Sequence, residues 1–454
     1  MNYVLNSPLD VQIELTTSCN HCCYYCYNFW RHDIKTKDNL LLSTKELVRI
    51  FDELKKNNIL SVTITGGEPF LYPQRVFKCL ELAKEAGIQI GINSNLHLLD
   101  EVEIKLLAKF KESSILTSIL SHRPEIHETM VNSKGSFNKT VKNIQNCLKR
   151  NIRVSVNMVL TKKNFHDIYQ TASFVKGIGV NTFCATRVVP PIGSDNFQEH
   201  CLSTDQIKAS LKTLLEVEKK LDMNVEVLNC YPKCIMSDAD IYSKFMNRIC
   251  IAGQTTLSIG ANGDIRPCSH SDMVYGNILT DDLKNIWDRM SEWRDGSLLP
   301  DFCREECSLR DICTGGCRVM AQYYGNIKGT DPNMEPCNVD SIRCLSKKIK
   351  NTNLLSIKKG FNKTQFKINT KFAFRKESFG GIVYIMGTRN MVSVNTGTCL
   401  YLQECFSKGY YLSMKEFLKH SNAKTAKEIV NVKRLFYKLT FKKILVPADL
   451  VNDL

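Results

Sequence analysis

The chain has 454 residues, of which 43% are hydrophobic and 24% are charged. This composition is typical of a globular protein of about two to four domains and excludes a wholly disordered chain. The sequence has no apolar run of about 18 residues and no basic segment followed by an apolar one at its N-terminus, which excludes a membrane span and a secretory signal. We therefore expect a soluble, cytoplasmic protein with no membrane partner.

The net charge of +15 is concentrated at one end of the chain. Residues 345–454 hold 21 Lys and Arg against 6 Asp and Glu, and the rest of the chain is neutral. A basic end on a neutral body favours an acidic partner for that end, although a Lys-rich composition without any partner is the alternative. The 20 cysteines are clustered, and in a reducing cytoplasm such clusters indicate metal ligands or catalytic groups rather than disulfides.

Residues 11–200 alternate strand-like and helix-like segments. The predicted strands are residues 11–16, 61–65, 88–93, 115–120, 153–160 and 181–189. Capping boxes, Ser43 with Glu46 and Ser203 with Gln206, predict the starts of two helices. Six strands with crossover helices predict a parallel α/β domain, either an open sheet or a partial barrel, and chemistry in such folds lies at the carboxyl ends of the strands.

The remainder of the chain predicts two further parts. In residues 245–345 cysteines are dense, and Asn262-Gly263 between two strand-like runs predicts a hairpin with a type I′ turn. This region is typical of a small domain held together by metal. Residues 346–371 are rich in Lys, Asn and Thr and predict a linker. Strands at 380–386 and 391–394, followed by helical patterns, predict a small winged-helix-like module.

The loop after the first predicted strand carries a C-x3-C-x2-C spacing made by Cys19, Cys23 and Cys26. Three thiolates on one short loop can bind three irons of a cubane cluster, which leaves the fourth iron open for a substrate or cofactor. A zinc site is the alternative, with Cys22 or His21 as the fourth ligand.

This triplet, together with Gly66-Gly67-Glu68-Pro69 after the second strand, resembles the signature of the radical SAM superfamily over residues 10–200. The resemblance implies a partial (β/α)6 TIM-like barrel and a [4Fe–4S] cluster whose open iron binds S-adenosyl-L-methionine. It also implies an external one-electron reductant, of the flavodoxin or ferredoxin type, and cleavage of the cofactor to a 5′-deoxyadenosyl radical that abstracts hydrogen from the substrate.

The resemblance further implies which residues contact the cofactor. Tyr25 lies near the adenine, and the Gly66–Pro69 segment binds the methionine amino group. The ribose and carboxylate contacts fall to residues at the ends of later strands, namely Asn93, Asn95, Ser118, Asn157 and Arg187. Ordinary capping of strand ends is the alternative for these five residues.

A second group of cysteines resembles the SPASM extension of radical SAM enzymes, which holds two auxiliary [4Fe–4S] clusters. Its run here is C-x3-C-x5-C-x3-C, one residue longer between Cys303 and Cys307 than in the family. The implied ligands are Cys250, Cys268 and Cys317 for the first cluster and Cys303, Cys307, Cys313 and Cys337 for the second.

Several alternatives stay open in this region. The first cluster lacks an evident fourth ligand: Cys234 is preferred over Cys230, and an open iron is the other choice. Cys344 competes with Cys337 for the second cluster. A zinc ribbon is the alternative for the whole set.

The C-terminal module, which opens with the run FRKESFGGIVY, resembles the peptide-recognition modules of ribosomal peptide (RiPP) maturases. Such modules hold a leader peptide as an added β-strand, and a basic module suits an acidic leader. A domain that only packs over the auxiliary clusters is one alternative. Nucleic-acid binding ranks last, because no aromatic side chains are interleaved with the basic ones.

Together these features predict a radical SAM enzyme that modifies a peptide or protein by forming a thioether, a carbon–carbon crosslink or an oxidised product. The enzymatic alternatives are formylglycine formation, as in anaerobic sulfatase maturases, and cofactor or haem biosynthesis on a small molecule. An iron–sulfur sensor or regulator is the non-enzymatic alternative. No catalytic side chain is assigned. The predicted domains are the radical SAM core 1–225, the SPASM domain 226–345, the linker 346–371 and the peptide-recognition module 372–454.

Overall fold

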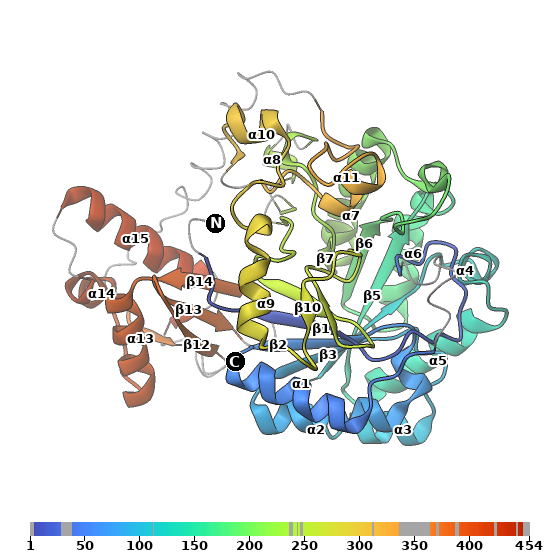
Figure 1. Ribbon diagram of the computed structural model, residues 1–454, viewed down its shortest axis with the longest axis horizontal. Helices are drawn as coiled ribbons and strands as arrows, with labels where there is room; N and C mark the ends of the chain where they lie inside the picture. The colour runs from blue at the N-terminus through green and yellow to red at the C-terminus, as the bar shows by residue number, and fades with distance from the viewer. Residues whose placement is uncertain are drawn as a thin grey trace. The chain divides into compact units, whose positions relative to one another are not determined.

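The computed structural model divides into two compact units, Met1–Lys348 and Ile349–Leu454 (Figure 1). It describes residues 4–28, 39–111, 113–235, 239–242, 244–245, 248–310, 313–335, 364–368, 372–385, 390–421, 425–441 and 444–447. The predicted core and SPASM regions therefore belong to one unit, because strands from both join the same sheet.

The first unit is built on a ten-stranded sheet of order β10-β9-β8-β1-β2-β3-β4-β5-β6-β7. Strands β1 to β8 pair in parallel, and β9 and β10 extend the sheet antiparallel beyond β8. The strands are β1 (Asp10–Glu14), β2 (Ser61–Thr65), β3 (Gln89–Asn93), β4 (Ser114–Ser118), β5 (Arg153–Leu160), β6 (Thr182–Arg187), β7 (Asn224–Glu226), β8 (Thr256–Ile259), β9 (Asp264–Arg266) and β10 (Gly276–Asn277).

Helices connect these strands, and Figure 1 shows α1, α2 and α3 together on one side of the sheet. The helices are α1 (Thr44–Lys56), α2 (Pro73–Ala86), α3 (Glu101–Leu107), α4 (Pro124–Val131), α5 (Ser136–Lys149), α6 (Ile168–Gly177), α7 (Thr204–Leu221), α8 (Ala239–Tyr242), α9 (Leu283–Arg289), α10 (Asp301–Glu305) and α11 (Arg318–Tyr323). The six predicted strands are confirmed as β1 to β6, and two of them have the predicted bounds.

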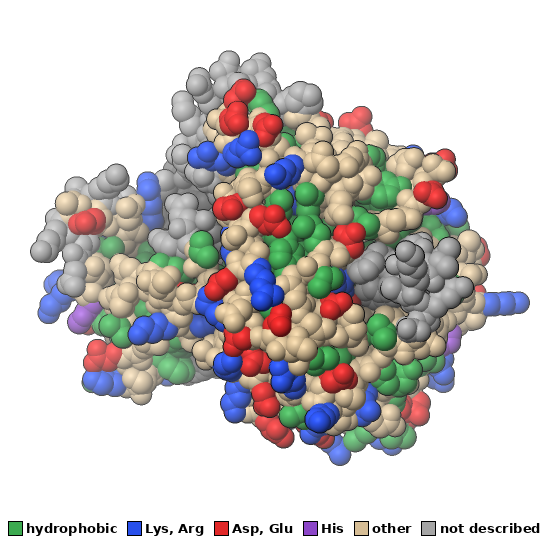
Figure 2. Space-filling view, in the orientation of Figure 1, with side chains coloured by type: hydrophobic (Ala, Val, Ile, Leu, Met, Phe, Trp, Pro, Cys, Tyr) green, Lys and Arg blue, Asp and Glu red, His purple; other side chains and the backbone are tan. Residues whose placement is uncertain are grey.

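Local sequence explains where these elements begin and which sides they bury. The Ser43–Glu46 capping box opens α1, as predicted, and the buried side chains of that helix lie at helical spacing. Every residue of β2 is buried, as expected for a parallel strand covered on both faces. Figure 2 shows Lys and Arg interspersed with Asp and Glu over α1 and α9, which agrees with the neutral charge of residues 1–344.

The hairpin between β8 and β9 forms where it was predicted, but its turn type differs. A type I′ turn needs positive φ at both central residues, and only Gly263, at 87°, has it; Asn262 does not. The Gly263 N–H instead donates to the Gly260 carbonyl at 2.9 Å, so the turn spans four residues. Beyond the turn, a buried ion pair between Arg266 and Glu14 ties β9 to the end of β1.

The second unit combines small antiparallel sheets with three helices. Strands β12 (Phe372–Glu377), β13 (Gly380–Ile385) and β14 (Asn390–Val394) form one sheet, and β11 (Phe366–Ile368) pairs with β15 (Leu445–Pro447). The helices are α13 (Thr396–Lys408), α14 (Met414–His420) and α15 (Ala426–Phe441). The predicted hairpin is confirmed as β13–β14, while the winged-helix assignment of this unit stays a prediction. Within the described part of the chain, no helix combines the length and apolarity that crossing a bilayer requires.

Candidate cofactor and auxiliary metal sites

The structure places the three cysteines of the C-x3-C-x2-C spacing on the loop that follows β1. Backbone hydrogen bonds hold this loop on helix α4. The Cys22 N–H donates to the Val131 carbonyl at 3.1 Å, and the Tyr24 N–H donates to the Met130 carbonyl at 3.3 Å. Main-chain contacts therefore fix this loop on α4.

His21 and Cys22, the alternative fourth ligands of a zinc ion, have environments that differ from each other. The His21 ring is buried, and its Nε2 lies 3.3 Å from Nδ1 of His97 in an edge-to-face contact. The His21 backbone N–H donates to the Cys19 sulfur at 3.4 Å. The Cys22 side chain is exposed. The structure therefore supports neither residue as the fourth ligand of a zinc ion.

The two glycines after β2 lie against the segment that leads into the cysteine loop. The Gly67 N–H donates to the Thr16 carbonyl at 2.7 Å, and the Glu68 N–H donates to the Ser18 carbonyl at 2.8 Å. A Cβ atom on Gly67 would lie 1.8 Å from the Ser18 oxygen, and Gly66 has a φ of 129°, which favours glycine. Glycine is required here because only a residue without a side chain permits this approach.

The Glu68 carboxylate, expected at the methionine amino group, is buried and used within the protein. It accepts hydrogen bonds from the Phe70 N–H at 3.0 Å, the Ser94 hydroxyl at 2.7 Å and the Asn95 N–H at 2.8 Å. Burial raises the pKa of this carboxyl above its usual range. This carboxylate joins the end of β2 to the end of β3, and contact between Gly66–Pro69 and a cofactor stays a prediction.

Asn93 and Ser118 end β3 and β4, as predicted, whereas Asn157 lies inside β5, three residues before its end. Ser118 of β4 is paired in register with Asn157 of β5. The Asn157 side-chain oxygen accepts a hydrogen bond from the Thr186 hydroxyl at 2.8 Å. The Asn95 amide donates to the Asn20 side chain at 2.8 Å, which ties this strand end to the cysteine loop. Asn93, the last residue of β3, is partly exposed beside them. Their contacts with a cofactor stay predictions.

Tyr25 lies in an apolar environment beside the cysteine loop. Its ring packs against the buried side chains of Leu120 and Val188 and stands edge-to-face with Tyr24 at 5.8 Å between ring centres. Burial and the neighbouring Cys23 raise the pKa of its phenol well above the usual value, so the hydroxyl stays protonated. Its place near an adenine stays a prediction.

Arg187 corrects the sequence-based expectation. Instead of being available for a cofactor carboxylate, its buried guanidinium forms a two-pronged ion pair with Asp331, with Nη2–Oδ2 and Nη1–Oδ1 distances of 2.6 and 3.0 Å. Nη2 also donates to the Cys230 carbonyl at 2.9 Å, and the guanidinium lies 4.9 Å from the Tyr231 ring centre. Arg187 therefore pairs with a carboxylate of the chain itself, that of Asp331, which lies 144 residues further along the sequence.

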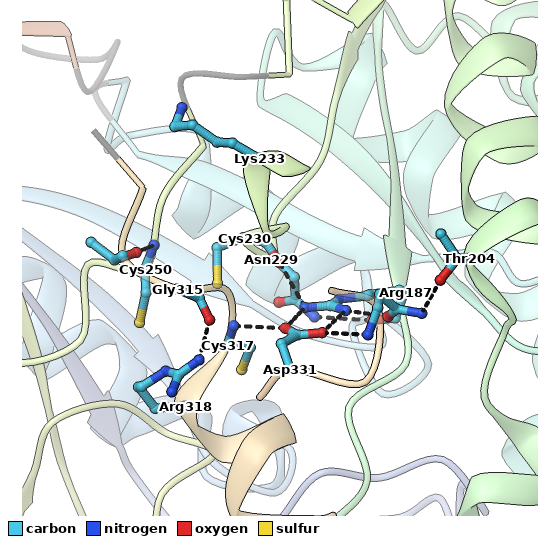
Figure 3. Close-up of polar contacts among 12 residues, drawn as sticks. Arg187, Thr204, Asn229, Cys230, Lys233, Cys250, Gly315, Cys317, Arg318 and Asp331 are labelled. Atoms are coloured by element: carbon cyan, nitrogen blue, oxygen red, sulfur yellow. Dashed lines mark hydrogen bonds and ion pairs between the residues drawn. The ribbon is translucent and has the colours of Figure 1, made fainter. Parts of the chain in front are cut away.

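Four cysteines from separate segments approach one another in the SPASM region: Cys230, Cys250, Cys268 and Cys317. The Cys230 thiol interacts with the thiols of Cys250 and Cys317, and Figure 3 shows these three sulfur atoms in one region. Hydrogen bonding from Cys230 lowers the pKa of Cys317 to about 7 and also lowers that of Cys250, which favours the metal-binding thiolate form. Cys268 interacts electrostatically with Cys250 and Cys317.

The structure describes three of the four ligands predicted for the second auxiliary cluster, namely Cys303, Cys307 and Cys313. Cys303 lies inside α10, and Cys307 follows the end of that helix, so the additional residue between them is taken up by the helical turn. Cys307 and Cys313 interact electrostatically, and the Lys233 N–H donates to the Cys313 sulfur at 3.4 Å. Cys337 and Cys344 lie outside the described residues.

A buried arginine beside the first set fits an anionic cluster. The Arg318 guanidinium donates to the carbonyls of Leu298, Ile327 and Gly329 at 2.9 to 3.2 Å and to that of Gly315. Among the described residues no carboxylate forms an ion pair with it. A buried cation normally requires a counter-charge, and a cluster held by four thiolates supplies one. The donor chemistry therefore fits an iron–sulfur cluster.

Within the residues that the structure describes, no three His, Cys, Asp or Glu side chains converge on a position for one metal ion. A cubane cluster does not need such convergence, because each of its thiolates binds a different iron.

The two cysteine regions are in direct contact. Tyr27, which follows Cys26, stacks on His270, two residues after Cys268, with ring centres 4.1 Å apart. Sequence reasoning missed this contact, and it also missed Arg318 and Asp331. A signal was present for Arg318, which directly follows a cysteine, whereas nothing in the local sequence marks Asp331.

Comparisons with known proteins agree with this geometry. The family model of the radical SAM superfamily matches residues 13–175, and a model of an iron–sulfur cluster-binding domain, SPASM, matches residues 250–318. The AdoMet-dependent heme synthase of Methanosarcina barkeri is 23% identical and spans 70% of this chain and 93% of its own. The subtilosin biosynthesis protein AlbA of Bacillus subtilis is 25% identical, over 68% and 67%.

Solved structures show the same fold. SuiB of Streptococcus suis superposes with a TM-score of 0.59 at 20% identity, over 73% of this chain and 78% of its own. SuiB has also been solved with S-adenosylmethionine and with its precursor peptide SuiA. Radical SAM and SPASM domains imply S-adenosylmethionine and [4Fe–4S] clusters as the cofactors. From its cysteine loop, its sheet and these matches, the chain belongs to the radical SAM superfamily of enzymes and carries a SPASM domain.

Proposed function

We propose that this enzyme modifies a peptide whose acidic leader binds the C-terminal unit. Cys19, Cys23 and Cys26 would hold the [4Fe–4S] cluster, which with S-adenosylmethionine supplies radical chemistry at unactivated carbon when an external reductant of the flavodoxin or ferredoxin class provides electrons. The chain itself supplies the binding surfaces that select and position the substrate.

The three-stranded sheet of the C-terminal unit carries this proposal. Strands β12 and β14 lie at its two ends, and among the described residues each pairs only with β13. The outer edge of a strand at the end of a sheet offers backbone N–H and carbonyl groups to an incoming extended peptide, which adds as a further strand. The same unit is connected to the enzyme by the chain itself, so a bound leader would be tethered near the catalytic unit.

The side chains of this unit also suit a peptide. Large apolar side chains are exposed on and after α13, with Phe406 44% and Tyr410 54% accessible. The Phe406 ring contacts Phe372 of the edge strand β12, at 4.3 Å between ring centres. Lys376 is exposed on the same strand, and residues 345–454 hold 21 Lys and Arg against 6 acidic residues. Aromatic contacts beside basic groups favour an acidic peptide with apolar anchors.

The comparisons support the peptide class without fixing the reaction. AlbA acts in the biosynthesis of a bacteriocin, subtilosin, and SuiB binds the precursor peptide SuiA. The proposal covers thioether formation, carbon–carbon crosslinking and oxidation, including formylglycine formation. No side chain described above selects among these outcomes.

The test is binding and turnover of a short acidic peptide encoded beside the gene. The full, reconstituted chain should bind the labelled peptide and release 5′-deoxyadenosine faster in its presence, and the peptide should change in mass. Lys376→Glu should weaken binding by about fivefold, which corresponds to about 1 kcal/mol. Lys55→Glu on α1, an exposed lysine of the other unit, is the matched control and should leave binding unchanged.

Haem or cofactor biosynthesis is the second candidate. The observation that favours it is the similarity to the Methanosarcina heme synthase, which extends over 93% of that protein. If neighbouring peptides neither bind nor change in mass, while an iron-porphyrin precursor is consumed with release of 5′-deoxyadenosine, the peptide proposal is wrong and this candidate replaces it.

A further inference from the structure

We propose that Cys230 is the fourth thiolate ligand of the first auxiliary cluster, and that the buried Arg187–Asp331 pair is the bracket that holds Cys230 and Cys317 in place. The inference concerns this chain's own residues around the SPASM site. It does not depend on whether the substrate is a peptide, so the two proposals fail independently.

The arrangement of sulfur atoms is the first step. Figure 3 shows the sulfur of Cys230 in the same region as those of Cys250 and Cys317, with which the Cys230 thiol interacts and which come from two distant segments of the chain. Cys268 interacts electrostatically with the same two residues, so four cysteines from separate segments share one neighbourhood. A cubane cluster has four irons, and four thiolates at one position can bind one each.

The bracket is the second step, and Figure 3 shows its members. At one end, Arg187 Nη2 donates to the Cys230 carbonyl at 2.9 Å. At the other end, Asp331 Oδ2 accepts the Cys317 N–H at 2.8 Å. The ion pair between them is 2.6 Å long, and the two side chains are 2% and 0% exposed. One buried pair therefore connects the backbones of two ligand residues.

Glycine at position 316 makes this bracket possible. Gly316 has a φ of 77°, and a Cβ atom on it would lie 2.6 Å from Asp331 Oδ2. Its absence of a side chain lets the carboxylate reach the N–H of Cys317. Asp331 also accepts the Asn333 N–H at 3.0 Å, which fixes its orientation. We therefore assign Arg187 and Asp331 as positioning residues for the cluster and not as ligands of S-adenosylmethionine.

The neighbouring Cys234 has a different environment. It lies on the same loop, next to Lys233, whose backbone N–H donates to the sulfur of Cys313 in the second set. The loop thus runs from the first set at Cys230 to the second set at Lys233. Cys230 is the cysteine of this loop that reaches Cys250 and Cys317, and for this reason it replaces Cys234 as our assignment for the first cluster.

Ligation of the first auxiliary cluster by four thiolates has a consequence for how the substrate binds. A fully ligated cluster has no open iron, so a substrate cannot bind to it through the metal. Substrate positioning is then left to side chains and backbone, and the role of the first auxiliary cluster is set by its reduction potential. Hydrogen bonding and nearby charge tune that potential, and the bracket controls both.

The decisive experiment uses the full chain, reconstituted anaerobically, in a Cys19/Cys23/Cys26→Ala background that removes the S-adenosylmethionine-binding cluster and leaves both auxiliary clusters. This background should retain about 8 irons per chain. Adding Cys230→Ala should give the electron paramagnetic resonance signal of a [3Fe–4S] cluster after oxidation, with loss of at least one iron. Adding Cys234→Ala, the matched control, should change neither quantity. If Cys230→Ala fails to fold, Cys230→Ser should fold and shift the midpoint potential of the same cluster.

The opposite pattern, with iron lost in Cys234→Ala and retained in Cys230→Ala, would assign the ligand to Cys234. No change in either variant would leave three ligands and an open iron. Both results would overturn the proposal, and neither would affect peptide binding by the C-terminal unit.

The bracket is tested by Asp331→Asn, which keeps the volume but removes the charge and one acceptor for the Cys317 N–H. We expect the iron content to remain and the midpoint potential of the first auxiliary cluster to shift, with Arg187→Lys giving a smaller shift. Glu377→Gln breaks a buried pair with Arg375 in the C-terminal unit and serves as the control. An unchanged potential in folded Asp331→Asn would show that the pair is only structural.

Discussion

The two cysteine regions of this enzyme are held in position by different means. The loop with Cys19, Cys23 and Cys26 is one short segment, and main-chain hydrogen bonds fix it to α4 and to the Gly66-Gly67 segment. The first auxiliary set comes from four distant segments, and buried charged side chains hold it together. Local spacing is therefore enough to specify the N-terminal cysteine loop, whereas the first auxiliary set forms only when distant segments fold together.

The largest expected effect is at the N-terminal loop, because its three cysteines are the proposed ligands of the S-adenosylmethionine-binding cluster. Cys23→Ala should abolish release of 5′-deoxyadenosine and remove about four irons per chain, because a cluster held by two thiolates is not retained. Cys22→Ala is the adjacent control. The Cys22 side chain is exposed, and only its backbone N–H holds the loop, so the variant should keep iron and activity. Equal losses in both variants would contradict the assignment.

The next effect tests the backbone support of that loop. Gly67→Ala places a methyl group 1.8 Å from the Ser18 carbonyl oxygen, so the loop must move. We expect the free energy of unfolding to fall by about 4 kcal/mol or more, which urea denaturation would measure. Gly177→Ala at the end of α6, where a Cβ atom meets nothing within 4 Å, should change it by less than about 1 kcal/mol.

The third prediction concerns the charged support of the auxiliary region. Arg318→Gln removes a buried cation whose described partners are carbonyls, and it should cost about 3 kcal/mol of unfolding free energy in the reconstituted protein. The cost should be smaller without the clusters, because the cation then has no counter-charge. The midpoint potential of the first auxiliary cluster should also become more negative, since a nearby positive charge is lost.

Arg294→Gln provides the comparison for this charge effect. Its guanidinium also donates to carbonyls, those of Gly253 and Trp287 at 2.8 and 2.6 Å, but Asp288 and Asp295 are close enough to interact with it. Its charge is therefore already compensated. We expect Arg294→Gln to lower the free energy of unfolding equally with and without the clusters. If Arg318→Gln does the same, the charge of Arg318 does not compensate the charge of the auxiliary cluster.

The same contrast explains what could be predicted from the sequence. The strands at 61–65 and 153–160 and the Ser43–Glu46 capping box follow from local patterns, and the structure has them as predicted. The cysteine triplet and the glycines after β2 are similarly local. These features depend on residues that are neighbours in the chain, so spacing alone carries the information.

The errors have a common cause. Arg187 ends a strand, as a cofactor ligand would, but its partner Asp331 is 144 residues away and is invisible to local reasoning. The sequence favours Cys234 over Cys230 as the fourth ligand, and the interaction of Cys230 with Cys250, on which our proposal of Cys230 rests, exists only in the fold. The turn at Asn262 depends on a backbone hydrogen bond from Gly263 to Gly260 that the dipeptide signal does not specify.

The smallest expected effect is a pH dependence at the helix that supports the N-terminal loop. His127 of α4 is buried, and its Nδ1 accepts the Leu120 N–H at 3.2 Å, which requires the neutral ring. Burial, with a smaller contribution from His21 and an opposing one from Glu128, lowers its pKa from 6.5 to about 4. Between these pH values the unfolded chain binds a proton that the folded chain does not, so stability falls as the pH falls, by at most about 3 kcal/mol.

Urea denaturation between pH 7 and pH 4.5 measures this effect, and a variant isolates it from other titrating groups. His127→Gln keeps an acceptor for the Leu120 N–H and cannot be protonated, so its stability should depend less steeply on pH than that of the parent chain. His166→Gln, at an exposed position, should leave the slope unchanged. Because α4 supplies the Met130 and Val131 carbonyls that hold the cysteine loop, acid should also loosen this loop. If the unfolding free energy of His127→Gln depends on pH as steeply as that of the parent chain, His127 on α4 is not the source of the acid sensitivity.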